Sequence, residues 1–188
     1  MSTDRHTSVP LAVRPPRAVR PSTRPGRRAQ PAPAADAPLR DLWAVVLTGG
    51  ETARLRPLVA ELCGDQRPKQ YAALLDSRAL LRQTLDRVGR RVPTERTVVV
   101  AVESQAADLT EHCRGPRGPH VLLQPHDRGT AAGVLLPAHW IGARDPEATM
   151  AVFPSDHFVL EEERFVEVVD AVSGFVARHP SWIVVLGV

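Results

Sequence analysis

Short apolar runs alternate with amphipathic stretches along the chain from residue 42 onward. The runs are rich in β-branched residues and apolar on both faces, which is typical of strands buried on two sides. The stretches between them repeat apolar residues at helical spacing. The runs lie at 43–47, 97–102, 120–123, 149–153 and 182–186, and the helical stretches near 79–91, 103–113, 130–143 and 161–178. This alternation predicts an α/β fold, with a mainly parallel sheet covered by helices on both faces.

Ligands of such sheets bind at the carboxyl ends of the strands, so the residues that follow each run are the first candidates for a site. The first run ends in Gly49-Gly50, with the basic residues Arg54 and Lys69 further on. Glycines there let the backbone approach a polyphosphate, which an arginine and a lysine can neutralise. The spacing matches neither the dinucleotide fingerprint nor a Walker loop. Lys69 is the only lysine in the chain. This lysine is either a specific phosphate contact or a residue without special function in a chain that otherwise uses arginine. The two glycines, taken alone, are also consistent with an ordinary strand-to-helix turn.

Polar residues also follow the third and fourth runs. The third run leads into Gln124-Pro125-His126-Asp127-Arg128-Gly129-Thr130 and the fourth into Pro154-Ser155-Asp156-His157. Asp156 is either a cation ligand or a cap for the segment that follows it. Ser155, Asp156 and His157 are adjacent in sequence, so their side chains diverge and they cannot form a catalytic triad.

The charge of the chain is unevenly spread. The net charge is +3, but residues 1–40 hold eight arginines and two acidic residues, so they carry +6 and the remainder −3. This segment is rich in Pro, Arg and Ala without apolar periodicity, which predicts a disordered tail at 1–40 before a folded domain at 41–188. The tail is either a basic arm for nucleic acid or an anionic membrane, or it is an inert extension. No aromatic side chains accompany its arginines, so base stacking has no platform, and the inert extension is favoured.

Two cysteines are too few for a disulfide framework or a zinc site. The chain also lacks an apolar stretch of signal-peptide or membrane-spanning length. These observations predict a cytoplasmic protein with no membrane partner. The final apolar run, at 182–186, is expected to be a strand without a partner, which indicates a domain that is incomplete at its C-terminus.

In their order and spacing, the glycine turn, the Pro68-Lys69-Gln70 segment and the two later segments resemble the sugar-nucleotide pyrophosphorylases. The Pro-Lys-Gln version is most similar to the mannose-1-phosphate guanylyltransferases within that family, and the similarity covers residues 42–188. The resemblance implies that Arg54 holds the leaving pyrophosphate, Lys69 the phosphates and Asp156 a Mg²⁺ ion, with these three as catalytic residues. It implies a nucleotide-binding set of Leu47, Gly49, Gly50, Arg54, Lys69, Gln124, Gly129 and Thr130.

The chain departs from the family turn, Gly-Gly-x-Gly-Thr/Ser-Arg, at two positions. Thr52 replaces a glycine, which costs about 1–2 kcal/mol if φ must be positive there. Ala53 replaces a hydroxyl that could bind a phosphate, a loss of roughly 1–2 kcal/mol. Asp127 adds a negative charge where many relatives carry asparagine. Together the changes at 52 and 53 would weaken nucleotide binding by about a hundredfold.

The resemblance implies an enzyme that transfers GMP from GTP to mannose 1-phosphate, giving GDP-mannose and pyrophosphate. An alternative is a non-catalytic paralogue with a vestigial nucleotide site, which forms a homo-oligomer or pairs with a full-length homologue. Binding of nucleic acid through the tail is a third hypothesis. Metal-dependent pyrophosphate release would distinguish the first from the other two.

Overall fold

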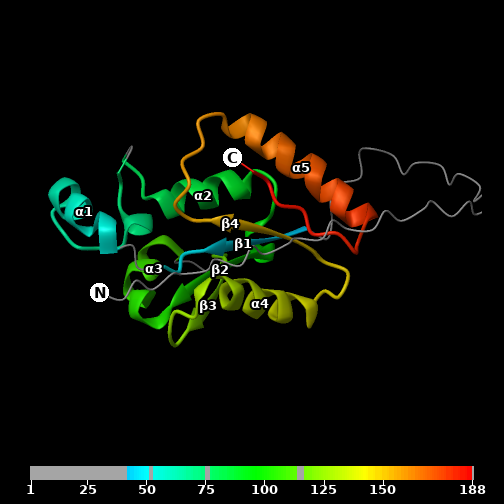
Figure 1. The fold of residues 1–188 in the computed structure, drawn as a ribbon, viewed down its shortest axis with the longest axis horizontal. Coiled ribbons are helices and arrows are strands. Elements are labelled where there is room, and N and C mark those ends of the chain that lie inside the picture. The colour runs from blue at the N-terminus through cyan, green and yellow to red at the C-terminus, as the bar shows by residue number, and fades with distance from the viewer. Residues whose placement is uncertain (1–41, 51–52, 75–76, 114–116, 188) are drawn as a thin grey trace, which may run out of the picture. The chain divides into compact units, whose positions relative to one another are not determined.

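A parallel four-stranded sheet forms the centre of the described part of the chain (Figure 1). The computed structural model describes residues 42–50, 53–74, 77–113 and 117–187, all within one compact unit. The predicted tail at 1–40 lies outside the described residues. The strands are β1 (Leu42–Leu47), β2 (Thr97–Val102), β3 (His120–Gln124) and β4 (Thr149–Pro154), in the order β3-β2-β1-β4. The predicted α/β class and the first four strands are confirmed.

Helices cover both faces of this sheet, as the two-sided apolar strands predict. The α-helices are α1 (Arg56–Cys63), α2 (Leu80–Gly89), α3 (Ala106–Cys113), α4 (Gly129–Gly142) and α5 (Glu162–Arg178). In Figure 1, α2 and α5 lie on one side of the strands and α4 on the other. None of the described helices combines the length and apolar content needed to cross a membrane.

Alternate residues of β1 and β2 feed two separate cores. Ala44 and Val46 pack in one core with side chains of α2, α3 and α5, whereas Val45 packs in the other with Ile141 of α4. All three β1 residues are fully buried. Burial on both faces explains why these strands read as continuous apolar runs rather than as alternating ones.

The predicted strand at 182–186 is wrong. These residues have no regular secondary structure, and their apolar side chains are exposed, up to 91% for Ile183. A strand exists only through hydrogen bonds to a neighbouring strand, and the described sheet has β3 and β4 as its edge strands, with no fifth strand paired to either. The β-branched residues of this segment favour a strand, but no described strand pairs with it.

Helix α1 was not predicted from the sequence. Pro57 lies in its first turn, and Gly64 caps its end with φ +77° and an N–H bond to the Ala60 carbonyl. Both are ordinary signals for a helix start and stop. The helix was missed because its leucines, Leu58 and Leu62, are exposed and do not mark a core-facing stripe.

The strand order creates a crevice at one point of the sheet. The chain passes from β1 to β2 and β3 on one side and then returns to place β4 on the other side of β1. The carboxyl ends of the parallel neighbours β1 and β4 therefore lie side by side, and open α/β sheets bind their ligands at this edge.

Candidate functional site

The glycine turn begins where β1 leaves the sheet. Thr48 is buried, and its N–H and hydroxyl both donate to the Val100 carbonyl at 2.9 Å. Gly50 follows with φ +114°, a conformation that L side chains rarely adopt. A Cβ atom added at Gly49 or Gly50 would meet no atom within 4 Å. The backbone of the turn is therefore open to an approaching ligand.

Lys69 and Asp156 form an ion pair across the crevice. Lys69 begins a short 3-10 turn, Lys69–Tyr71, and Asp156 follows β4. The Ser155 N–H donates to the Leu47 carbonyl at 3.1 Å, which continues the β1–β4 pairing up to the residue before Asp156. The two side chains are 22% and 25% exposed, so solvent and ligands can reach both charges.

Two adjoining hollows open at this edge of the sheet. The smaller has a volume of about 100 Å³ and the larger about 560 Å³. They share Leu47, Gly49, Gly50 and Thr130. The smaller also contains Val100, Ala101, Gln124, Asp127, Gly129 and Gly133, and the larger also contains Lys69, Gln70, Val134, Val152, Pro154, Ser155 and Asp156. The glycine turn is the shared wall between a mainly neutral hollow and a charged one.

The beginning of α4 closes the smaller hollow. Asp127 Oδ1 accepts a hydrogen bond from the Gly129 N–H at 2.8 Å, and Gly129 has φ +76°. The Asp127 carboxylate thus occupies a backbone donor at the helix start, in addition to placing negative charge at this hollow. Gln124, at the end of β3, is half-buried at the wall of the same hollow.

Arg54 lies apart from these residues. It is exposed, in the short 3-10 turn Ala53–Leu55, and neither hollow includes it among its lining side chains. Its predicted contact with pyrophosphate stays a prediction. Thr52 lies outside the described residues, so its predicted backbone cost is not tested.

A buried polar cluster that sequence analysis did not identify lies beneath the turn. It joins Thr48, Gln70, Tyr71 and Gln105, all at most 3% exposed. Gln70 Nε2 donates to the Thr48 carbonyl at 2.6 Å, and the Tyr71 hydroxyl lies 3.3 Å from both Thr48 Oγ1 and Gln105 Oε1. Burial raises the pKa of Tyr71 to about 12, so the phenol is neutral at physiological pH. In the sequence, only the Pro68-Lys69-Gln70 segment pointed to this cluster, and sequence analysis assigned a role to Lys69 but none to Gln70.

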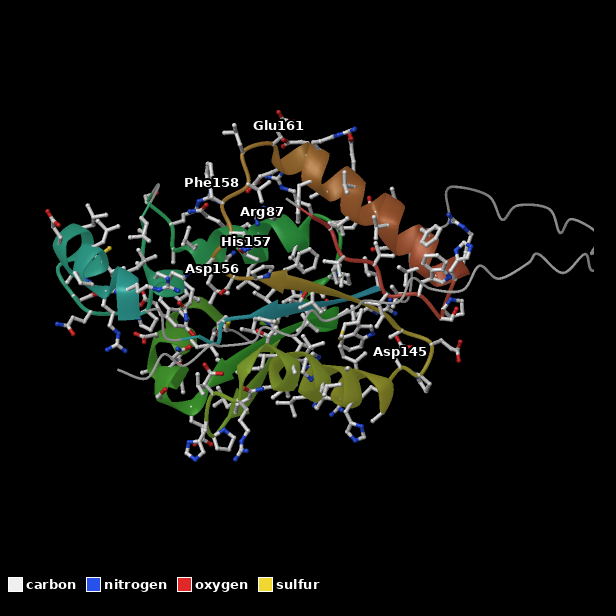
Figure 2. The ribbon with its side chains drawn as sticks, viewed as in Figure 1. Arg87, Asp145, Asp156, His157, Phe158 and Glu161 are labelled. Carbon is white, nitrogen blue, oxygen red and sulfur yellow. The ribbon has the colours of Figure 1, made fainter. Side chains whose placement is uncertain are left out.

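The segment between β4 and α5 carries the candidate metal ligand. Figure 2 shows Asp156, His157 and Phe158 along this segment, with Arg87 of α2 nearby. Among the described residues no group of three or more His, Cys, Asp or Glu side chains could hold a metal ion. Among the described residues that line the larger hollow, Asp156 is the one with an acidic side chain. A single carboxylate suits Mg²⁺, which takes one or two carboxylates and completes its shell with water and substrate phosphates.

Comparison with known proteins identifies the family to which the chain is similar. A family model described as "Nucleotidyl transferase" matches residues 43–178. The mannose-1-phosphate guanylyltransferase of Escherichia coli is 29% identical over 70% of this chain and 28% of its own length. The alginate biosynthesis protein AlgA of Pseudomonas aeruginosa is 30% identical over 64% of this chain and 24% of its own length. The chain thus matches about a quarter of the length of these relatives.

Solved structures show the same fold. A Thermus thermophilus protein, described as a mannose-1-phosphate geranyltransferase, superposes with a TM-score of 0.59 and 32% identity, over 70% of this chain and 37% of that one. A Helicobacter pylori mannose-6-phosphate isomerase superposes with a TM-score of 0.57 at 20% identity, which bears on the fold alone. The family match spans most of the chain and all four strands that form the two hollows. The chain belongs to the nucleotidyl transferase family.

Proposed function

We propose that the protein transfers GMP from GTP to mannose 1-phosphate, giving GDP-mannose and pyrophosphate. One observation carries the proposal: a hollow lined mainly by uncharged residues, with Asp127 at its edge, meets at the glycine turn a second hollow that contains the Lys69–Asp156 ion pair. A nucleoside triphosphate has the same division into a neutral base and a charged phosphate chain. The similarity to the E. coli mannose-1-phosphate guanylyltransferase supports the choice of guanine and mannose.

The smaller hollow is the proposed site of the nucleoside. The Gln124 side-chain amide offers a donor and an acceptor to a base edge. Gly129, without a side chain, allows close approach of the base. Leu47 and Thr130, at the boundary of the two hollows, would flank the sugar.

The larger hollow is the proposed site of the phosphates. An oxygen of the sugar phosphate attacks the α-phosphorus, the bond from this phosphorus to the bridging oxygen breaks, and pyrophosphate leaves with that electron pair. Because the attacking and attacked groups are both anions, the site must supply positive charge. Lys69 would supply it at the phosphates, with backbone N–H groups of Gly49 and Gly50 as further donors. In this proposal Arg54 contacts the leaving pyrophosphate.

Asp156 is the proposed holder of Mg²⁺, which when bound would neutralise phosphate charge. The carboxylate is already turned to Lys69 within the larger hollow. Binding of metal and nucleotide would therefore exchange partners: Lys69 would pass from Asp156 to a phosphate, and Asp156 would accept the metal. Each group keeps a partner of opposite charge in both states, so neither is left buried and unpaired.

A second candidate is a nucleotide-binding paralogue without turnover that pairs with a longer relative. The changes at Thr52 and Ala53, together with the position of Arg54 outside both hollows, favour it. It retains nucleotide binding and loses the chemical step, so the two candidates differ in a measurable way.

The test is thermal unfolding with Mg²⁺ and GTP, ATP, UTP or dTTP, followed by an assay of pyrophosphate release with sugar 1-phosphates. Nucleotide at about 100 times its Kd adds roughly 2.7 kcal/mol, a rise in Tm of several °C. We expect a shift selective for GTP that Lys69→Met abolishes. Arg82→Met is the control, because it removes an ion pair to Asp86 on α2 away from both hollows.

Pyrophosphate release specific to mannose 1-phosphate would support the enzyme. Nucleotide binding without release with any sugar 1-phosphate would support the paralogue. A folded protein that no nucleotide stabilises would contradict both candidates.

A further inference from the structure

Gln70 connects the two parts of the candidate phosphate site from beneath. It follows Lys69 directly, and its side chain is almost fully buried, at 2% exposure. Its Nε2 lies 2.6 Å from the Thr48 carbonyl oxygen and 3.4 Å from Gln105 Oε1. Thr48 is the residue immediately before the glycine turn. One side chain therefore joins the turn that carries Lys69 to the turn that carries the free backbone donors.

The hydrogen bond to Thr48 determines the direction of one particular donor. A trans peptide unit is planar, and its N–H points opposite to its C=O. The Thr48 carbonyl and the Gly49 N–H belong to the same unit. When Gln70 holds the carbonyl, the Gly49 N–H is turned to the opposite side. This N–H makes no hydrogen bond within the described part of the chain, and Gly49 lies at the wall of both hollows.

Tyr71 reinforces the same connection. Its hydroxyl lies between Thr48 Oγ1 and Gln105 Oε1, at 3.3 Å from each. Gln105 ends the short 3-10 turn Glu103–Gln105 that follows β2. The segments after β1 and β2 and the Lys69–Tyr71 turn are thus held in one neutral, buried network.

The network is poorly suited to stability alone. Gln105 Nε2 is buried and has no hydrogen-bond partner among the described residues. A buried polar group without a partner is unfavourable, and apolar side chains of the same shape would avoid that penalty. The network thus includes one donor that no described residue satisfies, and it lies directly beneath the candidate site.

We propose that Gln70 is a positioning residue. Its amide keeps the glycine turn and Lys69 in a single relative arrangement before any nucleotide binds, so both contacts to the phosphates are ordered in advance. The proposal rests on the proposed nucleotide site. Ordering in advance strengthens binding because the ligand need not order the two turns itself.

The first test requires no ligand. Backbone ¹⁵N order parameters at Gly49 and Gly50 are measured for wild type, Gln70→Met and the control Gln83→Met. Gln83, on α2, is a matched control because it is also buried. Its Nε2 donates a hydrogen bond to a backbone carbonyl, that of Arg78, at 3.0 Å. We expect the values to fall from about 0.85 towards 0.6 in Gln70→Met alone. Values equal to wild type would overturn the positioning role whether or not GTP binds.

The second test is a double-mutant cycle on the Kd for GTP. Gln70→Met is expected to weaken binding about tenfold in the wild-type background and less than about threefold when Lys69→Met is also present, because residues that act through one arrangement are not additive. Equal effects in both backgrounds would mean that Gln70 acts independently of Lys69 and would overturn the proposal. If wild type binds no GTP, the proposed function fails and the order parameters still decide the role of Gln70.

Tyr71→Phe provides a second, milder variant should Gln70→Met fail to fold. It removes the hydroxyl and keeps the ring, which stacks on His112 at 5.8 Å between centroids. We expect a smaller decrease of the same order parameters. No change in this variant, with Gln70→Met unfolded, would also count against the proposal.

Discussion

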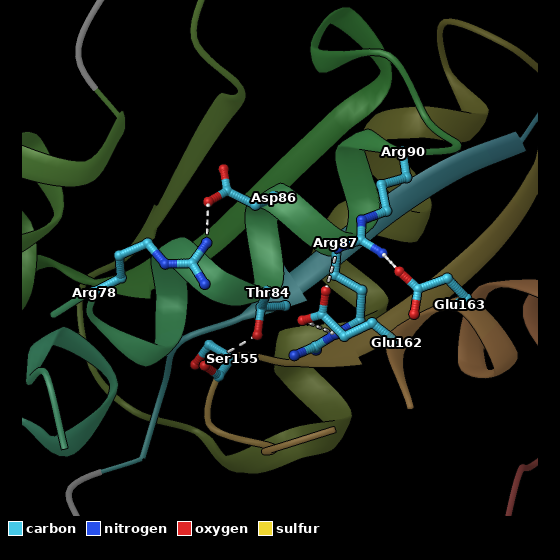
Figure 3. A network of polar contacts seen from close by, with 8 residues as sticks. All are labelled: Arg78, Thr84, Asp86, Arg87, Arg90, Ser155, Glu162 and Glu163. Carbon is cyan, nitrogen blue, oxygen red and sulfur yellow. Dashed lines mark hydrogen bonds and ion pairs between the residues drawn. The ribbon is translucent and has the colours of Figure 1, made fainter. Parts of the chain in front are cut away.

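The buried guanidinium of Arg87 predicts an unequal response to the loss of either partner of its ion pair. Arg87 lies on α2 at 3% exposure, with Nε 3.4 Å from Glu162 Oε1 in the first turn of α5 (Figure 3). Among the described residues its Nη2 has no hydrogen-bond partner, and burial lowers the pKa of Arg87. Glu162 is 24% exposed and also pairs with Arg90. The arginine bears most of the desolvation penalty, whereas the glutamate has a second partner.

The two substitutions therefore differ in what they leave behind. Arg87→Met removes a desolvated charge, fills similar volume, and leaves Glu162 paired with Arg90. We expect the free energy of unfolding to stay within about 1 kcal/mol of wild type. Glu162→Gln leaves the Arg87 charge buried without its carboxylate. For a fully buried pair this costs about 3–5 kcal/mol, and because Glu162 is partly exposed we expect roughly 2 kcal/mol, or about 4–8 °C in Tm.

Urea unfolding followed by tryptophan fluorescence, with calorimetry as a second probe, measures both variants. Glu163→Gln is the control: Glu163 pairs with Arg90 at 2.9 Å on the surface, and its removal should leave the midpoint unchanged. A larger loss in Arg87→Met than in Glu162→Gln would show that the buried pair is net stabilising and would refute the reasoning.

Three further predictions concern the candidate site and its surroundings. Gly50→Ala should lower the free energy of unfolding by about 1–2 kcal/mol because Gly50 has a positive φ, while Gly49→Ala should lower it little. An added Cβ meets no atom within 4 Å at either position, so equal losses in the two variants would contradict a purely conformational origin. Lys69→Met should remove the ion-pair partner of Asp156 and so increase the affinity of the ligand-free protein for Mn²⁺ by up to about fivefold, as measured by electron paramagnetic resonance. The double variant with Asp156→Asn should show no increase. An unchanged affinity in Lys69→Met would argue against the exchange of partners. Burial lowers the pKa of His112 below its ordinary 6.5, so the unfolded state binds a proton at higher pH than the folded state does, and the free energy of unfolding should fall as pH falls below about 6.5. His112→Phe should reduce this loss, as measured by urea unfolding at a series of acidic pH values. An equal loss in both proteins would contradict the role of His112.

Much of the fold was predictable because it depends on local patterns. Strands buried on both faces need apolar residues at nearly every position, and β1 and β2 show this directly in sequence. Glycines with positive φ at Gly50 and Gly129 mark turns, because other residues are strained there. The residues that end or follow the strands, Gln124 and Asp156 among them, lie at the hollows where parallel topology was expected to bring them.

Other features could not be predicted because they depend on neighbours distant in sequence. The segment at 182–186 has the composition of a strand, but pairing is a tertiary event and the structure shows none for it. The network of Gln70 and Tyr71 consists of residues that are unremarkable along the chain and become informative only when buried against Thr48 and Gln105.

The sequence by itself determined the fold class, the family and the residue types available for phosphate chemistry, since these follow from periodicity, glycine positions and ordered motifs. The tertiary structure alone decided which of those residues meet. The placement of β4 beside β1 brings Asp156 to Lys69, and the burial of Gln70 joins the two turns below them. The physical reason is that strand order and burial are properties of the whole sheet, which no local stretch of sequence encodes.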